Sequence, residues 1–294
     1  MKIATAAYPL DPVTDWAAYA EKLRAWVAEA AGQGAELLLF PEYGAMELAM
    51  LDGPEAAGDL ERALGAVSRH IPDADSLHSD LSAEFGVHIC AASAPVLDAD
   101  IGPRPVNRAR LFAPQGGVGM QDKQIMTRFE REEWDVVPGG PLRVFDTALG
   151  RIGILICYDA EFPLLGRALS EVDVILVPSA TEALAGYSRV RIGAMARALE
   201  NQCVTVMAST VGDAAWCPAV DENTGMGGVF GPPDTGFPAT GVIAECVLNR
   251  PGWTYAEVDP AAVAHVRADG VVLNRAHWDE QPARAGKATN HRLR

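Results

Sequence analysis

The chain has 294 residues, of which 49% are hydrophobic and 21% are charged, the balance of an ordinary globular protein. A formal net charge of −15 argues against binding to a nucleic-acid backbone or to an anionic membrane surface. No apolar run approaches the ~20 residues that a membrane-spanning helix needs. We therefore expect no nucleic-acid partner and no membrane partner.

Five cysteines are scattered through the chain with no C-x-x-C pair: Cys90, Cys157, Cys203, Cys217 and Cys246. This odd number argues against a disulfide framework or a zinc cluster, and the six histidines show no paired metal spacing. The N-terminus lacks the apolar stretch of a signal peptide. We expect a cytoplasmic protein without a metal, with Cys90 and Cys203 in its core.

The first half of the chain predicts alternating strands and helices. In chain order, we expect a strand at 3–7, an amphipathic helix at 16–31, an apolar strand at 36–40 ending in Pro41-Glu42, a helix, a strand at 87–91 and a hairpin around 114–117.

The second half predicts the same order of elements. We expect a strand at 152–156, a helix at 164–170, a strand at 172–177 ending in Pro178-Ser179, a helix, a strand at 204–208 and a hairpin around 232–236. This repetition predicts an α/β fold: an α–β–β–α sandwich of two mixed β-sheets flanked by helices, with a pseudo-twofold internal repeat.

No linker or composition shift separates the halves, so we expect a single domain over residues 1–294. A strand at 253–258 and a short helix at 261–268 follow the second half. The last segment, from about 270 to 294, is basic near its end. It is either an extended C-terminal arm or a frayed tail, and the sequence leaves both interpretations open.

Cys157 follows the apolar strand 152–156 and precedes a turn that opens a helix, with Pro163 at a tolerated early position. A thiol on such a turn is presented at a sheet edge, near helix N–H groups that favour its thiolate. The alternative is a free cysteine that serves as a small buried hydrophobe. Cys217, in a loop, is a second candidate for an exposed, reactive thiol.

Three charged residues stand near expected strand ends. Glu42 follows the strand 36–40, Lys123 lies where the first hairpin returns, and Glu130 comes seven residues later. Because ligand sites in open sheets lie outside the carboxyl ends of the strands, these residues are candidates to lie beside Cys157. Taken singly, each is more often a solvated charge.

Several segments occur in a fixed order: Phe40-Pro41-Glu42-Tyr43, Lys123 with Glu130, Cys157-Tyr158-Asp159, Phe162-Pro163, Pro178-Ser179-Ala180-Thr181, and Arg189-Val190-Arg191 leading into Ala196-Arg197-Ala198-Leu199-Glu200-Asn201. Together they resemble the nitrilase, or carbon–nitrogen hydrolase, superfamily. The resemblance implies the sandwich fold and a triad in which Glu42 is the general base, Lys123 stabilises the oxyanion and Cys157 is the nucleophile. Glu130 matches a second glutamate beside the lysine, and the neighbouring Glu132 and Glu133 remain alternatives.

The chemistry of such a triad needs no cofactor. Glu42 takes the proton of Cys157 as the thiolate attacks a carbonyl or nitrile carbon, and Lys123 with the backbone N–H of Tyr158 binds the oxyanion. Glu42 then protonates the leaving amine and activates water against the thioester. For Glu42 to act as base, then acid, then base again, its pKa must be raised toward neutrality by burial.

The substrate is predicted to be a small amide. True nitrilases generally carry Cys-Trp-Glu where this chain has Cys-Tyr-Asp, so an amidase or an N-carbamoyl amidohydrolase is favoured over a nitrilase. Candidate pocket residues are Tyr43, Trp134, Tyr158, Glu161, Thr181, Glu182 and Trp216. Either Glu161 or Glu182 is a candidate to face a positively charged amine of the substrate.

Two alternatives from other classes remain open, an acyltransferase and a catalytically silent scaffold. The resemblance also implies pairing of subunits through a helix layer, so a homodimer or a higher homo-oligomer is expected. Arg197 and Glu200, one helical turn apart, are expected to form a structural ion pair.

Overall fold

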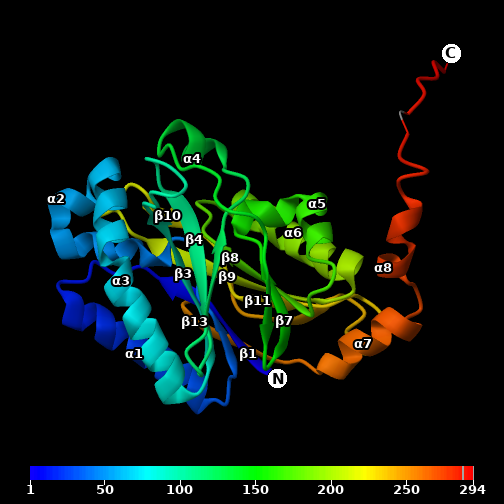
Figure 1. Ribbon diagram of the computed structural model, residues 1–294, viewed down its shortest axis with the longest axis horizontal. Coiled ribbons are helices and arrows are strands. Elements are labelled where there is room, and N and C mark those ends of the chain that lie inside the picture. The colour runs from blue at the N-terminus through cyan, green and yellow to red at the C-terminus, as the bar shows by residue number, and fades with distance from the viewer. Residues whose placement is uncertain (287, 294) are drawn as a thin grey trace.

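The computed structural model describes residues 1–286 and 288–293 of the chain (Figure 1). The strands are β1 (Lys2–Pro9), β2 (Leu37–Leu39), β3 (His88–Val96), β4 (Val106–Phe112), β5 (Val118–Asp122), β6 (Val144–Thr147), β7 (Gly150–Ile154), β8 (Val174–Ser179), β9 (Val204–Asp213), β10 (Glu222–Asn223), β11 (Gly228–Phe230), β12 (Val242–Glu245) and β13 (Gly252–Glu257). The α-helices are α1 (Trp16–Gly32), α2 (Pro54–Ala57), α3 (Leu60–Phe85), α4 (Arg128–Glu132), α5 (Pro163–Ala168), α6 (Leu184–Asn201), α7 (Pro260–Asp269) and α8 (Asn274–His277). Three 3₁₀ segments are η1 (Gly44–Asp52), η2 (Cys157–Glu161) and η3 (Trp278–Glu280).

The strand pairing confirms the internal repeat. In the first half β1, β2 and β3 pair in parallel, and β4 and β5 add antiparallel strands. In the second half β7, β8 and β9 pair in parallel, and β11 and β12 add antiparallel strands. Each half also has one antiparallel strand beside its first strand, β13 next to β1 and β6 next to β7.

The two halves are joined by one parallel contact, in which the end of β1 pairs with β9 from Ala7↔Ser209 to Pro9↔Val211. The ladder is therefore continuous in the order β5-β4-β3-β2-β1-β9-β8-β7-β6, a nearly closed mixed sheet. Helices α1 and α3 cover one outer face, and α5 and α6 cover the other (Figure 1).

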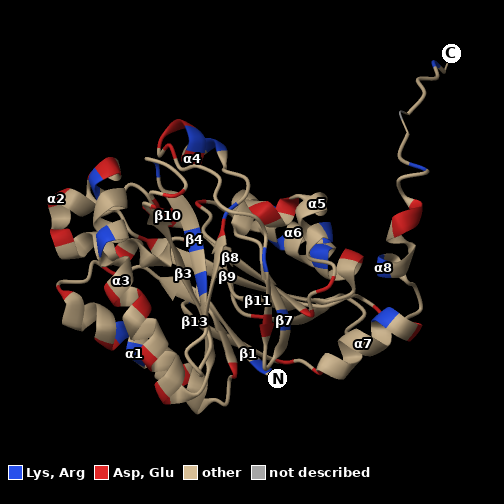
Figure 2. Cartoon of the chain, in the orientation of Figure 1, with Lys and Arg blue, Asp and Glu red and all other residues tan. Residues whose placement is uncertain are grey.

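The short strand β2 shows how the layers pack. Leu38 packs into the cluster that contains Leu23 of α1 and Leu64 of α3. Leu37 and Leu39 point the other way, into the core that also holds the strands of the second half. Because both faces are buried, β2 is apolar at every position rather than alternating. Charged side chains lie mostly on helices and loops, although β4 also carries basic positions (Figure 2).

Some sequence predictions differ in detail. The strand at 36–40 is limited to Leu37–Leu39, since Pro41 has no N–H for the ladder. The 3₁₀ segment η1 was not predicted. Cys90 and Cys203 are core residues as expected, and Arg197 pairs with Glu200 at 3.0 Å.

The expectation of an exposed Cys217 is wrong, since this thiol is fully buried and packs into the cluster under α1 and α3. Beyond η3 the described residues form no helix or strand and extend away from the body (Figure 1). Residues 287 and 294 of the predicted arm lie outside the described part. Within that part, no helix is both long and apolar enough to cross a membrane.

Candidate active site

The sequence candidates follow the carboxyl ends of one strand in each half of the chain. Glu42 follows β2, and Cys157 follows β7 at the start of η2. Tyr43 and Cys157 both have left-handed backbone conformations, with φ of 54° and 49°. Such conformations cost energy in residues other than glycine, and they turn the chain sharply at the end of each strand.

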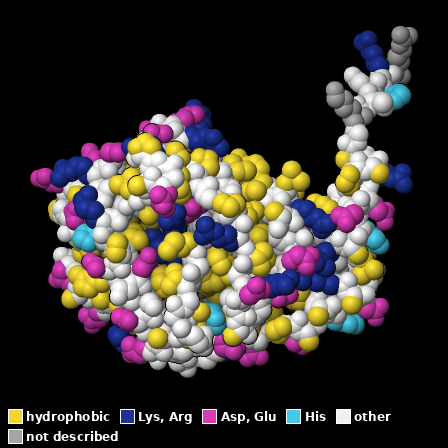
Figure 3. Space-filling view, in the orientation of Figure 1, with side chains coloured by type: hydrophobic (Ala, Val, Ile, Leu, Met, Phe, Trp, Pro, Cys, Tyr) yellow, Lys and Arg dark blue, Asp and Glu magenta, His cyan; other side chains and the backbone are white. Residues whose placement is uncertain are grey.

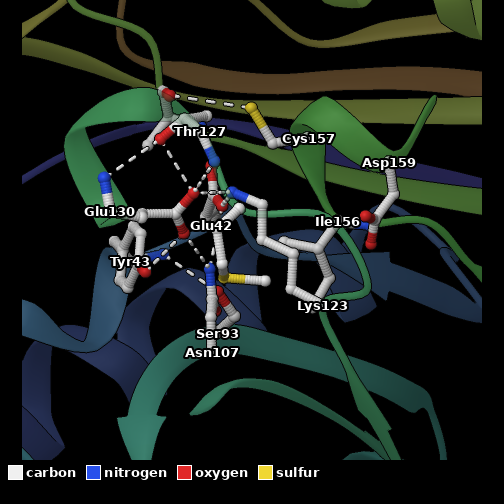
Figure 4. Close-up of polar contacts among 12 residues, drawn as sticks. Glu42, Tyr43, Ser93, Asn107, Lys123, Thr127, Glu130, Ile156, Cys157 and Asp159 are labelled. Atoms are coloured by element: carbon white, nitrogen blue, oxygen red, sulfur yellow. Dashed lines mark hydrogen bonds and ion pairs between the residues drawn. The ribbon is translucent and has the colours of Figure 1, made fainter. Parts of the chain in front are cut away.

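Lys123 connects the two glutamates. Its Nζ lies 2.7 Å from Glu42 Oε1 and 2.6 Å from Glu130 Oε2, and all three side chains are at most 4% exposed (Figure 4). Lys123 follows β5 directly, and its backbone N–H donates to the carbonyl of Asn107 on β4 at 2.8 Å. The hairpin that the sequence predicted thus delivers the ammonium to the buried carboxylates.

Glu130 is held by the start of its own helix. The backbone N–H and the hydroxyl of Thr127 donate to Glu130 Oε2 at 2.8 and 2.9 Å, in a capping box. The Tyr43 hydroxyl donates to Glu130 Oε1 at 2.7 Å. Glu132 instead pairs with Arg128, and Glu133 is exposed. Of the three neighbouring glutamates, Glu130 is therefore the one in contact with Lys123.

The backbone of Ala180, after β8, lies against both Glu42 and Cys157. Its N–H donates to Glu42 Oε2 at 3.0 Å, and its carbonyl accepts from Cys157 Sγ at 3.7 Å (Figure 4). Glu42 Oε2 and Cys157 Sγ are thus both held against the backbone of Ala180, whereas Glu42 Oε1 faces Lys123.

Burial dominates the protonation of the thiol and its neighbours. Burial and the charge of Glu42 raise the pKa of Cys157 well above its ordinary value. Burial also raises the pKa of Glu42, although the charge of Lys123 opposes this shift. The expectation that the turn favours a thiolate is wrong for the resting protein, because the Glu42 carboxylate and the loss of water both disfavour the ionised sulfur.

The pKa values of Lys123 and Glu130 shift in the directions expected of an ion pair. Burial alone would lower the pKa of Lys123, but the charges of Glu130 and Glu42 outweigh it and raise that pKa above its ordinary value. Burial opposes ionisation of Glu130, but Lys123 outweighs it and lowers the Glu130 pKa. Lys123 and Glu130 are therefore charged, whereas the pKa of Glu42 is shifted in the opposite direction to that of Glu130.

Asp159 ties the cysteine turn to the lysine loop. Its carboxylate accepts from the backbone N–H of Gln124 at 3.1 Å, of Ile125 at 2.9 Å and of Ile156 at 3.3 Å. Burial raises the pKa of Asp159 to about 7, against the opposing charge of Lys123. The sequence analysis used this residue only as part of a motif.

The candidate pocket residues are spread over several environments. Tyr43 and Trp134 are buried and pack edge to face, with ring centroids 4.7 Å apart. The ring of Tyr158 packs edge-on against Phe162, with centroids 4.8 Å apart. Tyr43 reaches Glu130, so it lies behind the carboxylate rather than beside the thiol.

Of the remaining pocket candidates, Glu161 ends η2, Thr181 and Glu182 follow β8, and Trp216 lies on the loop between β9 and β10. Glu161 pairs with Arg189 at 3.7 Å, and the Thr181 hydroxyl donates to the carbonyl of Thr224 at 2.7 Å. Glu182 is exposed and Trp216 is half-buried. Within residues 1–286 and 288–293, no three His, Cys, Asp or Glu side chains are placed to hold a metal ion.

The fold and this buried cluster together define a member of the nitrilase superfamily. The chain belongs to the carbon–nitrogen hydrolase family, whose family model matches residues 2–268. The expected superfamily and sandwich fold are thereby confirmed.

Among curated proteins, the probable hydrolase YhcX of Bacillus subtilis (strain 168) is 31% identical over 274 residues, which are 92% of this chain and 52% of the relative. A deaminated glutathione amidase of Yersinia enterocolitica is 34% identical over 145 residues, 45% of this chain and 50% of the relative. The chain spans about half the length of these two curated relatives.

Two solved structures share the fold. Nit3 of Saccharomyces cerevisiae, a member of branch 10 of the nitrilase superfamily, has a TM-score of 0.72 at 21% identity, covering 94% of this chain and 95% of that chain. An amidase variant from Nesterenkonia sp. AN1, which shows Michael addition of acrylamide at the active site cysteine, has a TM-score of 0.67 at 24% identity, covering 92% and 97%.

Proposed function

We propose that this protein hydrolyses a non-peptide C–N bond of a small linear amide through a thioester on Cys157, releasing an acid and ammonia or an amine. The observation that carries the proposal is the buried contact of Lys123 with Glu42 and Glu130 beside the thiol. Relatives named as amidases, from Yersinia enterocolitica and from Synechocystis, support the amide.

In the first step the Cys157 thiol transfers its proton to Glu42 as the sulfur attacks the carbonyl carbon. The C=O π electrons move to the oxygen, which becomes an oxyanion. An ammonium has three N–H donors, and two of those of Lys123 go to the glutamates among the described residues. The third is available to the oxyanion, together with the backbone N–H of Tyr158.

Collapse of the oxyanion breaks the C–N bond, and protonated Glu42 gives its proton to the leaving nitrogen. Ionised Glu42 next removes a proton from water as the water oxygen attacks the thioester carbon. The C–S bond then breaks, Glu42 returns this proton to the leaving sulfur, and the acid and the Cys157 thiol are released. The raised pKa of Glu42 suits a group that must accept and donate the same proton within one cycle.

A nitrilase or an N-carbamoyl amidohydrolase is the second candidate. The same triad serves a nitrile carbon, and a relative from Pyrococcus abyssi that is 31% identical over 199 residues is named as a nitrilase. The Cys-Tyr-Asp sequence at the nucleophile favours the amide. An acyltransferase would transfer the acyl group of the thioester to an amine instead of to water. A catalytically silent scaffold would form no thioester.

The substrate is proposed to approach along the loops that follow β7 and β8. Tyr158 and Thr181 lie on these loops, and Glu161 or Glu182 is the proposed contact for a positively charged amine. Glu182 is exposed, whereas Glu161 already pairs with Arg189. We further propose a cytoplasmic homodimer or larger homo-oligomer built from single-domain subunits.

A substrate panel tests the proposed function. Small linear amides, the matched nitriles and N-carbamoyl compounds are incubated with the protein, and the acid and ammonia or amine are quantified. We expect amides to be hydrolysed and Cys157→Ala to lower turnover by about 10³-fold or more, with Cys246→Ala as the matched control. Turnover that survives Cys157→Ala, or the absence of turnover across the panel, overturns the proposal. Added hydroxylamine would reveal acyl transfer.

A further inference from the structure

Asn107 is an uncharged side chain at the centre of the charged cluster. It lies on β4 and is fully buried. Its Nδ2 donates to Glu42 Oε1 at 2.9 Å and lies 3.4 Å from Glu130 Oε1 (Figure 4). Nothing in the sequence analysis singled it out, and the mechanism above does not use it.

The orientation of the Asn107 amide follows from electrostatics. The opposite orientation would place its oxygen against two carboxylates, so the NH₂ group must face them. The Oδ1 atom then has no hydrogen-bond partner among the described residues. Both N–H groups of this buried amide point at carboxylates, while its oxygen stays without a hydrogen bond within the described part of the chain. Such an arrangement lowers the stability of the fold, which indicates a role in the site.

The contacts of Glu42 are divided between its two oxygens. Oε1 accepts from Lys123 Nζ at 2.7 Å and from Asn107 Nδ2 at 2.9 Å. A carboxylate oxygen offers about two lone-pair sites, so both sites of Oε1 are occupied. Oε2 accepts the backbone N–H of Ala180 and has no second donor among the described residues, and the carbonyl of the same Ala180 accepts from Cys157 Sγ.

We propose that Asn107 is a positioning residue that occupies Glu42 Oε1 and so directs the proton of Cys157 to Glu42 Oε2. This inference rests on the proposed function, since it assigns a role within the same proton transfer. Asn107 acts at two places, because its backbone carbonyl also accepts the N–H of Lys123 at 2.8 Å.

The ionisable groups that face the Asn107 amide are Glu42 and Glu130. Lys123 contacts both glutamates, Tyr43 contacts Glu130, and Cys157 and Glu42 share the backbone of Ala180. Side chains alternate along a strand, so Arg108 and Arg110 of β4 lie on the opposite face.

On that opposite face Arg108 pairs with Asp98 and Asp122, and Arg110 pairs with Asp75 of α3, where His78 also packs. Asp159 is near enough to Lys123 for their charges to interact. All of these groups are unchanged by a substitution at position 107, so each variant is compared with the wild type at every pH.

Two near-isosteric variants test the proposal with opposite predicted shifts. Asn107→Leu removes the donor, so ionised Glu42 is less stabilised and the acid limb of thiol reactivity moves to higher pH. Asn107→Asp donates like the amide when protonated but repels both glutamates when ionised. Its reactivity is therefore kept at low pH and lost as the pH rises.

The readout is the rate of Cys157 alkylation by iodoacetamide as a function of pH, followed by intact mass in a Cys246→Ser background. We expect alkylation of the Leu variant at pH 7 to slow by about 10-fold or more. Both variants retaining the wild-type pH profile, whatever the rate, would overturn the proposal. If the Leu variant does not fold by circular dichroism, the profile of the Asp variant decides alone.

Alkylation needs no amide substrate, which separates this inference from the proposed function. If the wild type hydrolyses no amide but the pH profiles of the two variants shift in opposite directions, the amidase proposal is rejected and the role of Asn107 is kept. Amide turnover with unshifted variant profiles rejects the role of Asn107 alone.

Discussion

At the scale of single residues, the site depends on the unequal surroundings of two glutamates. Glu130 accepts from Lys123, Thr127 and Tyr43, which lowers its pKa and keeps it charged. Glu42 is as deeply buried, and burial together with the charge of Glu130 raises its pKa against the opposing charge of Lys123. The pKa values of two carboxylates that share one ammonium thus shift in opposite directions, which suits one carboxylate to carry protons and the other to hold the lysine.

Replacing Glu130 with glutamine tests this division of roles. Glutamine keeps the shape but removes the charge that holds Lys123, so kcat for the amide should fall by about 10- to 100-fold with a small change in KM. Glu132→Gln is the matched control on the same helix, because Glu132 is exposed and, within the described part of the chain, pairs only with Arg128. Equal losses in both variants, or full activity of Glu130→Gln, would contradict the assigned role.

At the scale of secondary-structure elements, Asp159 connects η2 to the loop after β5. The nucleophile and the lysine come from different halves of the chain, and three backbone N–H groups from these two segments converge on one carboxylate. The Asp159 carboxylate therefore holds the backbone that precedes the thiol against the backbone that follows the lysine.

Asp159→Asn should weaken this connection, because an amide NH₂ cannot accept the backbone N–H groups that the second carboxylate oxygen accepts. Leaving such donors unsatisfied should lower the free energy of unfolding by about 1–3 kcal/mol in a denaturant titration, and kcat should fall with it. Asp146→Asn, at an exposed ion pair with Arg151, is the control. A stable, fully active Asp159→Asn protein would refute the connection.

The sequence predicted most strands and the main helices because apolar runs and proline stops are local signals. It did not predict η1, since the stabilising contacts of its buried Glu47 come from Lys22 and Tyr8 of distant elements. Among site residues, Asn107 was missed because one polar residue within a strand carries no local signal. Cys217 was misjudged because a loop sequence does not show what packs over it.

At the scale of the whole molecule, apolar side chains remain exposed on the helix layer of the second half. Leu164 of α5 is 77% exposed, and Leu184 and Ile192 of α6 are 56% and 65% exposed. Figure 3 shows hydrophobic side chains at the surface over α5. Such a cluster is typical of a surface that another protein covers, here proposed to be a second copy of the chain.

Light scattering should therefore give the mass of a dimer or a larger assembly. Ile192→Glu should shift the population toward the monomer because it buries a charge in the interface, whereas Val144→Glu, on the edge strand β6, should not. A monomeric wild type at micromolar concentration would contradict the proposed assembly.

The most direct test of the central claim is intact-mass detection of an acyl group on Cys157 during turnover. The protein is mixed with a small amide, quenched in acid and digested, and we expect the acyl mass on the peptide that contains Cys157. Cys157→Ala should show neither adduct nor turnover. Turnover in the Cys157→Ala protein, or an acyl group on a different residue, would contradict the account.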